Sequence, residues 1–386
     1  MFILDAPYVS EFLKQSLQDH QIPVLKTAYA AEVLANYQIN FISETKARSA
    51  GYSHSGLYTN SENALGWIYE NWPDSEVARM ATLVKDKVQF REVLAEIHPD
   101  FEFKGVTYTD LPDIDPATLP FPLILKPSIG FFSLGVQRIE NEEQWTSNLD
   151  RLDGWSRSYA NLYPEMVLDN DVFIIEAVIP GEEFAVDCFY DEEGSVVILN
   201  MMKHLFASGA DMNDRVYVTS GSLVDKYLEP VQAYLDRLGA LFKLTNFQAH
   251  IELRIDGAKI TAIEINPLRF GGWCSTADLA YHAWQLNLYS AVVRKTTPQW
   301  RSLVKRDPEY VYALVVLNNS TGVSGNEIQS FDYEALLRRI SHPLELRRTD
   351  FKQFPVFGFL MCKVSVMDMS ELDELLHSDL REFIQV

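Results

Sequence analysis

Hydrophobic and polar residues alternate in two neighbouring segments, 250–256 and 263–266, and this period of two predicts two β-strands of one hairpin. The apolar positions are Ile251, Leu253, Ile255, Ile263 and Ile265, and the polar positions are His250, Glu252, Arg254, Glu264 and Asn266. A slip of one residue turns every side chain to the other face, so the isoleucines share a face only in an even register. A tight turn at Asp256 and Gly257 gives an odd register, whereas a loop centred on Ala258 gives an even one.

In the even register Glu252 lies directly across from Glu264, and His250 lies across from Asn266, with Cβ atoms about 5 Å apart. Two carboxylates and an amide oxygen that converge from rigid strands are the ligands that hold Mg²⁺ against nucleotide phosphates. We therefore predict a metal site formed by Glu252, Glu264 and Asn266. The alternative is a half-exposed hairpin whose polar face is acidic without binding a metal.

The rest of the pattern predicts a mixed α/β and α+β protein in three parts, residues 1–84, 85–300 and 301–386. The first part is a small α/β unit with strands at Met1–Leu4 and Ile22–Leu25 and a helix at Tyr8–Asp19. The turn after its first strand contains no glycine, so a dinucleotide-binding fingerprint is absent. The last part is expected to be an α+β subdomain that covers the central core.

The composition of the chain limits which classes of molecule it can bind. The chain has 386 residues, a net charge of −21 and a pI of about 4.8, which argues against nucleic acid or an anionic membrane as the main partner. The N-terminus lacks the pattern of a signal peptide, and no apolar run is long enough to span a membrane. Three widely spaced cysteines fit a reducing compartment, so we expect a cytoplasmic protein.

A buried strand at Leu123–Lys126 ends in a lysine and is followed by a loop that contains Gly130, Ser133 and Gly135. A lysine beside a glycine-bearing loop offers one fixed cation and several backbone N–H groups to a polyphosphate. The alternative is an ordinary turn between a strand and a helix, with an exposed lysine.

A second apolar strand, within residues 173–187, is interrupted by Pro180 and Gly181. Proline cannot donate to a β-ladder and glycine permits unusual torsions, so the break suits a hinge between two lobes. The backbone from Ala177 to Ile179 and the carboxylate of Glu176 would face a purine, and Glu182 or Glu183 would accept hydrogen bonds from ribose hydroxyls. The alternative is a hairpin turn with solvated acidic residues.

These segments follow one another in a defined order. A strand with a lysine and a glycine loop comes first, a strand with Glu and a hinge follows, and His-x-Glu and Glu-x-Asn-Pro come last. This order closely resembles the ATP-grasp superfamily over about residues 86–275. The resemblance is closest to its carboxylate–amine (L-amino acid) ligases. It implies that residues 1–84 are a pre-ATP-grasp domain. It also implies a nucleotide-binding core with lobes at about 85–183 and 184–300.

The resemblance also implies a role for individual residues. Nucleotide binding is implied for Lys87, Lys126, Ser133, Glu176, Val178 and Glu183, and metal binding for Glu252, Glu264 and Asn266. The family usually has Asn-Pro-Arg, but here Leu268 intervenes and the arginine is Arg269. We assign Arg269 to the acyl phosphate or the substrate carboxylate.

The expected function is that of an ATP-dependent ligase that joins a carboxylic acid to an amine through an acyl phosphate and releases ADP and phosphate. The cofactors would be ATP and Mg²⁺, or Mn²⁺ in its place, and the partners would be a small-molecule carboxylate and amine. Two alternatives are another ATP-grasp activation, through carboxyphosphate or a phosphorylated metabolite, and a non-catalytic ATP-binding protein. A homodimer is the default assembly for such enzymes.

Overall fold

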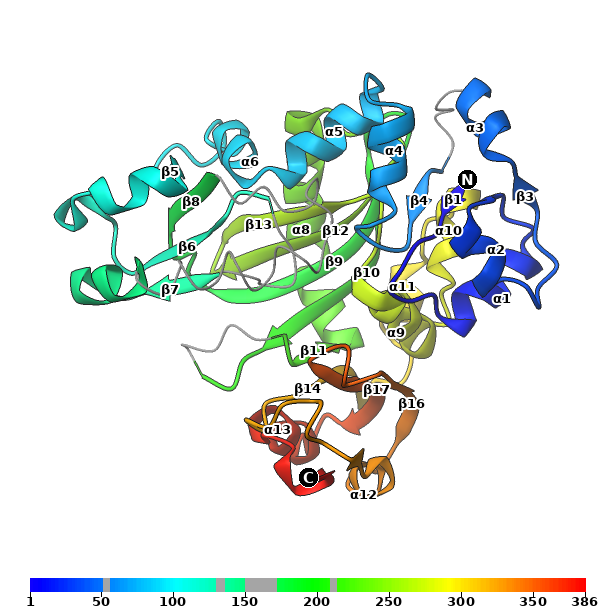
Figure 1. The fold of residues 1–386 in the computed structure, drawn as a ribbon. Helices are drawn as coiled ribbons and strands as arrows, with labels where there is room; N and C mark the ends of the chain where they lie inside the picture. Colours follow the sequence, from blue (N-terminus) through cyan, green and yellow to red (C-terminus); the bar gives the residue numbers. More distant parts are fainter. Residues whose placement is uncertain (51–55, 130–135, 150–171, 209–213) are drawn as a thin grey trace.

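Four short parallel strands form the sheet of the N-terminal unit, in the order β3-β2-β1-β4 (Figure 1). The computed structural model describes residues 1–50, 56–129, 136–149, 172–208 and 214–386. The strands are β1 (Phe2–Ile3), β2 (Val24–Leu25), β3 (Phe41–Ile42) and β4 (Tyr58–Thr59). The helices are α1 (Glu11–Asp19), α2 (Ala28–Val33), α3 (Glu44–Ala50), α4 (Leu65–Asn71) and α5 (Glu76–Lys85). The predicted α/β unit is therefore present.

The first helix is shorter than its hydrophobic pattern predicted. It begins at Glu11 rather than Tyr8, because Ser10 adopts an extended backbone and its Oγ accepts a hydrogen bond from the Leu13 amide at 3.0 Å. Leu13 and Leu17 lie on its buried face and pack into the core of the unit.

A smaller antiparallel sheet has the order β5-β8-β6-β7. Its strands are β5 (Phe103–Thr107), β6 (Leu123–Pro127), β7 (Gln137–Ile139) and β8 (Val172–Ala177). The proline-rich segment before β6 contains two short 3₁₀-helices, η1 (Tyr108–Asp113) and η2 (Pro116–Thr118). Helix α6 (Lys87–Leu94) packs against this sheet, so one end of α6 lies near the predicted lysine of β6.

The largest sheet has the order β13-β12-β9-β10-β11-β14-β17-β16, and all its pairings are antiparallel. The strands are β9 (Glu182–Tyr190), β10 (Val196–Leu205), β11 (Val216–Thr219), β12 (Phe247–Asp256), β13 (Lys259–Pro267), β14 (Tyr310–Asn318), β16 (Pro343–Arg348) and β17 (Val356–Ser365). Because β11 pairs with β14, one ladder continues across the boundary expected near residue 300.

Helices connect these strands and cover the sheet. The long helix α8 (Gly221–Phe242) packs on β10. The others are α9 (Ser275–Trp284), α10 (Leu288–Arg294) and α11 (Trp300–Leu303). Helix α10 contacts α1, and Asn287 donates to Ser16 Oγ at 2.8 Å, so this part of the chain packs on the N-terminal unit.

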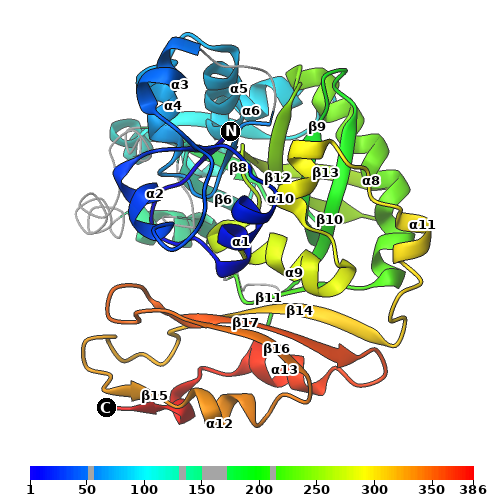
Figure 2. The same ribbon diagram turned by 90° about the vertical axis from the view of Figure 1, so that its right-hand side faces the viewer.

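The C-terminal residues lie below the rest of the chain in Figure 2, and their apolar side chains form a hydrophobic cluster together with Val216 and Val218 of β11. Besides β14, β16 and β17 they contain β15 (Ser330–Phe331), α12 (Tyr333–Leu337), α13 (Ser370–His377), η5 (Arg381–Phe383) and β18 (Ile384–Gln385). All three cysteines are buried and free. Within the described residues, no helix is both long and apolar enough to cross a membrane.

Candidate functional site

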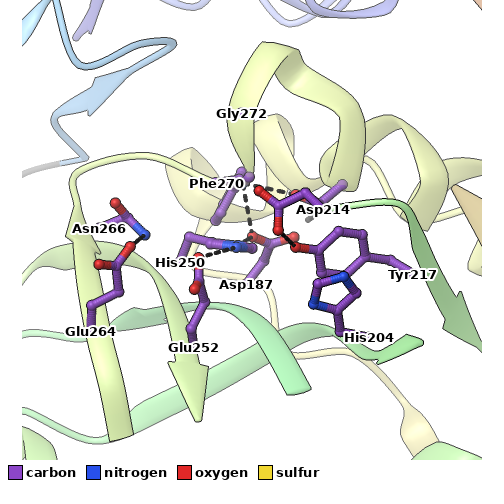
Figure 3. Close-up of polar contacts among 12 residues, drawn as sticks. Asp187, His204, Asp214, Tyr217, His250, Glu252, Glu264, Asn266, Phe270 and Gly272 are labelled. Carbon is purple, nitrogen blue, oxygen red and sulfur yellow. Dashed lines mark hydrogen bonds and ion pairs between the residues drawn. The ribbon is translucent and has the colours of Figure 1, made fainter. Parts of the chain in front are cut away.

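The hairpin of β12 and β13 has the register that the alternation predicted. Glu252 pairs directly with Glu264, and His250 pairs directly with Asn266. Leu253 and Ile265 are fully buried on the opposite face, whereas the two glutamates stay partly exposed. The predicted register is therefore confirmed, and it brings the candidate metal ligands to one face of the sheet (Figure 3).

The predicted route to this register was wrong. The hairpin has no loop centred on Ala258; it has a two-residue turn at 257–258, closed by the pair Asp256–Lys259. Such a turn gives an odd register close to the loop, as expected for tight turns. A β-bulge at Ile263 adds one residue to β13 and restores the register beyond it. Ile263 is thus the unpaired bulge residue and not a member of the buried face.

The three candidate metal ligands lie together. Asn266 Nδ2 donates to Glu264 Oε1 at 3.0 Å, and the side chains of Glu252 and Glu264 are 27% and 22% exposed. Asn266 Oδ1 accepts from Arg269 at 2.8 Å. The Asn266 amide must therefore rotate by half a turn to present its oxygen to a cation beside Glu264. This rotation exchanges the positions of the amide nitrogen and oxygen and leaves the shape of the side chain unchanged.

The pKa values of the two glutamates are shifted in opposite directions. Burial opposes the ionisation of Glu264, but the positive charges of Lys87, Lys126 and Lys85 outweigh it and lower its pKa to about 2. Burial, together with the charge of Glu264, raises the pKa of Glu252 well above its usual value. Two carboxylates at this separation repel each other, and a divalent cation between them would remove that repulsion.

The donor set fits a hard divalent cation that also has ligands from elsewhere. Two carboxylates and one amide supply oxygen atoms, the ligands that Mg²⁺ prefers. In the part of the chain that the structure describes, no group of three or more His, Cys, Asp or Glu side chains could hold a metal ion. A cation held here would therefore take its remaining ligands from water or phosphate, as Mg²⁺ does in nucleotide sites.

Lys87 lies at the start of α6, and its Nζ is 3.4 Å from Glu264 Oε2. Asp86 caps this helix by accepting from the Val88 and Gln89 amides at 2.9 and 3.2 Å, and it also accepts from Ser128 Oγ at 2.6 Å. The cap thus ties the start of α6 to the end of β6, which carries the second predicted lysine. The structure brings Lys87 to the candidate metal ligands, although the two are far apart in sequence.

The predicted phosphate lysine and the predicted adenine-side carboxylate contact each other. Lys126 Nζ lies 2.6 Å from Glu176 Oε1, and Arg91 Nε donates to Glu176 Oε2 at 2.6 Å. All three side chains are buried. Burial opposes ionisation of Glu176, but Arg91 and Lys126 lower its pKa to about 2. Both Glu176 oxygens therefore have cationic partners.

The remaining hinge residues are also engaged. The Val178 amide donates to Pro122 O at 3.2 Å, so it is not a spare donor for a purine. Glu183 accepts from Arg254 Nη2 at 2.9 Å and lies 3.0 Å from His204 Nδ1. Burial opposes ionisation of Glu183, but its hydrogen bond with His204 and the charge of Arg254 lower its pKa. Ser133 lies outside the described residues.

Arg269 is buried between the N-terminal unit and the large sheet. Its Nε and Nη2 donate to Glu62 Oε1 at 2.9 and 2.8 Å, and its Nη1 donates to Phe270 O at 2.9 Å. Lys85 Nζ lies 2.6 Å from the other Glu62 oxygen. Leu268, the residue that separates Asn-Pro from the arginine, has a left-handed backbone with φ of 59°, and its carbonyl accepts from the Thr59 amide at 2.7 Å.

A second polar network lies behind the candidate ligands (Figure 3). His250 Nδ1 lies 2.7 Å from Asp187 Oδ1, which also accepts from the Gly271 amide at 3.1 Å. The other ring nitrogen of His250 is 3.8 Å from Glu252 Oε1. His250 therefore joins a buried aspartate to a candidate metal ligand.

Sequence reasoning missed Glu62, Lys85 and Arg91. Arg91 had a usable signal, because it follows Lys87 by four residues and lies one helical turn further along the same face. Glu62 and Lys85 had none, because they meet Arg269 only through the packing of the N-terminal unit on the large sheet.

Comparisons with known proteins show which fold the chain shares. Residues 119–277 match the family model of the ATP-grasp domain. The L-amino acid ligase from Bacillus licheniformis has a similar structure, with a TM-score of 0.69 and 15% sequence identity over 100% of this chain and 97% of that one. No curated protein matches the chain by sequence.

Two further solved structures resemble the whole chain. The N5-carboxyaminoimidazole synthase from Aspergillus clavatus, in complex with ADP and 5-aminoimidazole ribonucleotide, has a TM-score of 0.63 and 12% identity over 99% of this chain and 98% of that one. The phosphoribosylglycinamide synthetase from Anaerococcus prevotii has a TM-score of 0.58 and 15% identity over 100% and 98%. At these identities the likeness shows a shared fold.

Proposed function

We propose that the chain, whose residues 119–277 match the ATP-grasp domain, is an ATP-dependent ligase that joins a carboxylic acid to an amine and releases ADP and phosphate. The reaction would pass through an acyl phosphate. A carboxylate is a poor electrophile and forms only a salt with an amine, whereas an acyl phosphate carries a leaving group that the amine can displace.

One observation carries the proposal. Two glutamates face each other across a β-hairpin, and the pKa of one of them is lowered by three nearby lysines. Carboxylates and clustered cations at one place suit a ligand that contains both phosphates and a divalent cation. Phosphoryl transfer depends mainly on positioning and on neutralising charge, so it needs these groups more than it needs a protein nucleophile.

Each residue has a proposed task. Lys87 and Lys126 would neutralise phosphate charge, Glu176 and Val178 would contact the adenine side, and Glu183 would contact the ribose. Ser133 would donate to the phosphates. These contacts need rearrangements, because Glu176, Glu183 and the Val178 amide already have partners.

Glu252, Glu264 and Asn266 would hold Mg²⁺, or Mn²⁺, which takes the same oxygen ligands. When bound, the cation would supply Lewis-acid neutralisation of the charge on the transferred phosphate. The chain's own contribution is the fixed position of its carboxylates, which the pairing of β12 with β13 and β9 maintains.

Arg269 would orient the substrate acid. Its guanidinium already binds the carboxylate of Glu62, which is the type of group that it would hold in a substrate. A substrate carboxylate would share or exchange this position, in the bidentate geometry that arginine favours.

The test is ADP release over a panel of acids and amines, with wild type, Glu264→Ala and a control. Glu229 is an exposed glutamate of α8, so Glu229→Ala is the matched control. We expect amine-dependent ADP release that Glu264→Ala abolishes and Glu229→Ala retains. Unchanged turnover in Glu264→Ala would reject the metal assignment. Mg²⁺-dependent ATP binding without turnover on any pair would favour a non-catalytic binding protein, and release with bicarbonate alone would favour carboxyphosphate chemistry.

A further inference from the structure

Arg91, which was not predicted from the sequence, contacts several parts of the candidate site. It lies on α6, and its side chain is 2% exposed. Its Nε donates to Glu176 Oε2 at 2.6 Å, its Nη1 donates to Ala262 O at 2.6 Å, and its Nη2 donates to Ile263 O at 3.2 Å. One guanidinium therefore joins β8 of the smaller sheet to β13 of the large sheet.

The two carbonyls that Arg91 binds belong to the β-bulge. Ala262 pairs with Leu253, Glu264 pairs with Glu252, and Ile263 between them is the extra residue. The bulge determines that Glu264 lies across from Glu252, because without it the tight turn would place the neighbouring residue there. The Ala262 amide is held separately, since it donates to the Tyr234 hydroxyl at 2.8 Å. Arg91 thus binds the two carbonyls of the bulge, and Tyr234 binds its Ala262 amide.

The other end of the guanidinium is the buried carboxylate of Glu176, which also contacts Lys126. A guanidinium is planar and rigid, so its Nε and Nη groups move as one body. A displacement of Glu176 would therefore be transmitted to the bulge carbonyls, and through them to Glu264. A lysine at this position has one ammonium group on a flexible chain and cannot serve the three acceptors in this fixed arrangement.

We propose that Arg91 is a positioning residue that couples the adenine side of the site, at Glu176, to the metal side, at Glu264, by holding the β13 bulge. This inference rests on the proposed nucleotide-binding function. It assigns Arg91 no contact with substrate. Through Arg91, a nucleotide base bound at the hinge stabilises the arrangement of the metal ligands before the reaction begins.

The first test needs no nucleotide. In the full-length protein, hydrogen exchange followed by mass spectrometry would compare wild type with Arg91→Lys. We expect exchange in the segment 259–267 to rise about tenfold or more, as for the loss of a charge-assisted hydrogen bond, while β9 and β10 exchange as in wild type. Unchanged exchange in 259–267 would overturn the proposal. Tyr234→Phe is the control, because it loosens the same bulge without touching Glu176.

The second test measures the coupling. Adenosine lacks phosphates, so it reports on the hinge alone. We expect adenosine to protect both segment 173–178 and segment 259–267 in wild type and in Tyr234→Phe, and only segment 173–178 in Arg91→Lys. If Arg91→Lys does not fold, Glu176→Gln provides the test, since it keeps the contacts of Arg91 to the bulge but weakens the connection to the hinge.

The outcomes separate the two proposals. If neither ATP nor adenosine protects any segment of wild type, the proposed function fails. If adenosine protects segment 173–178 of wild type but leaves 259–267 unchanged, the nucleotide site stands and the coupling by Arg91 is overturned. A similar adenosine response of segment 259–267 in wild type and Arg91→Lys also overturns it.

Discussion

Replacing Glu62 by glutamine tests the buried charge cluster at the junction of the N-terminal unit and the large sheet. Glu62 is 7% exposed and lies between Lys85 and Arg269, whose side chains are 8% and 10% exposed. Burial opposes ionisation of Glu62, but the charges of Lys85 and Arg269 lower its pKa from 4.5 to about 2. In Glu62→Gln two buried cations lose their shared anion, so the folded state should be destabilised.

The magnitude follows from the pKa shift. Lowering the pKa of Glu62 from 4.5 to about 2 corresponds to about 3 kcal/mol of unfolding free energy. Because the folded-state pKa is the lower one, this contribution is complete above about pH 4.5 and is lost as the pH falls towards 2. The difference in stability between wild type and Glu62→Gln should therefore be about 3 kcal/mol at pH 7 and about 1 kcal/mol at pH 3.

Urea unfolding at pH 7, 5, 4 and 3, followed by tryptophan fluorescence and circular dichroism, would measure this difference. Glu229→Gln is the control, because Glu229 is exposed and should change stability by less than about 0.5 kcal/mol at every pH. A difference between wild type and Glu62→Gln that does not vary with pH, or one below about 0.5 kcal/mol at pH 7, would refute the reasoning.

Two further predictions concern the start of α6. Lys87→Met removes the cation 3.4 Å from Glu264, so ATP binding measured by calorimetry should weaken about tenfold; an affinity equal to that of wild type would contradict the role given to Lys87. Asp86→Ala removes the helix cap and the partner of Ser128, so thermal or urea unfolding should show a loss of about 1–2 kcal/mol, and a change near zero would show that the cap does not stabilise α6.

The alternation of residues 250–266 was sufficient to predict which side chains meet on the hairpin. It was insufficient to predict how the two strands reach this register, because a period of two does not distinguish a wider loop from a tight turn followed by a bulge. Only the tertiary contacts of Ala262 and Ile263 with Arg91 and Tyr234 reveal why the bulge lies at this point.

Strands β1, β2, β6 and β8 were similarly accessible from the sequence, because they are short apolar segments bounded by prolines and polar residues. The partners of Arg269 were not. Its contact with Glu62 spans 207 positions of the chain, and it depends on how the N-terminal unit packs against β13. No local pattern carries that information, so the sequence did not predict that Arg269 binds the carboxylate of Glu62.

The central claim is that Glu264 and Glu252 hold a divalent cation against a nucleotide, and ATP affinity with and without Mg²⁺ tests it most directly. Calorimetric titration of wild type, Glu264→Gln and Glu229→Gln with ATP would be run at equal ionic strength. Mg²⁺ should strengthen ATP binding at least tenfold in wild type and Glu229→Gln, and Glu264→Gln should lose this gain. Equal strengthening by Mg²⁺ in Glu264→Gln, or none in wild type, would contradict the claim.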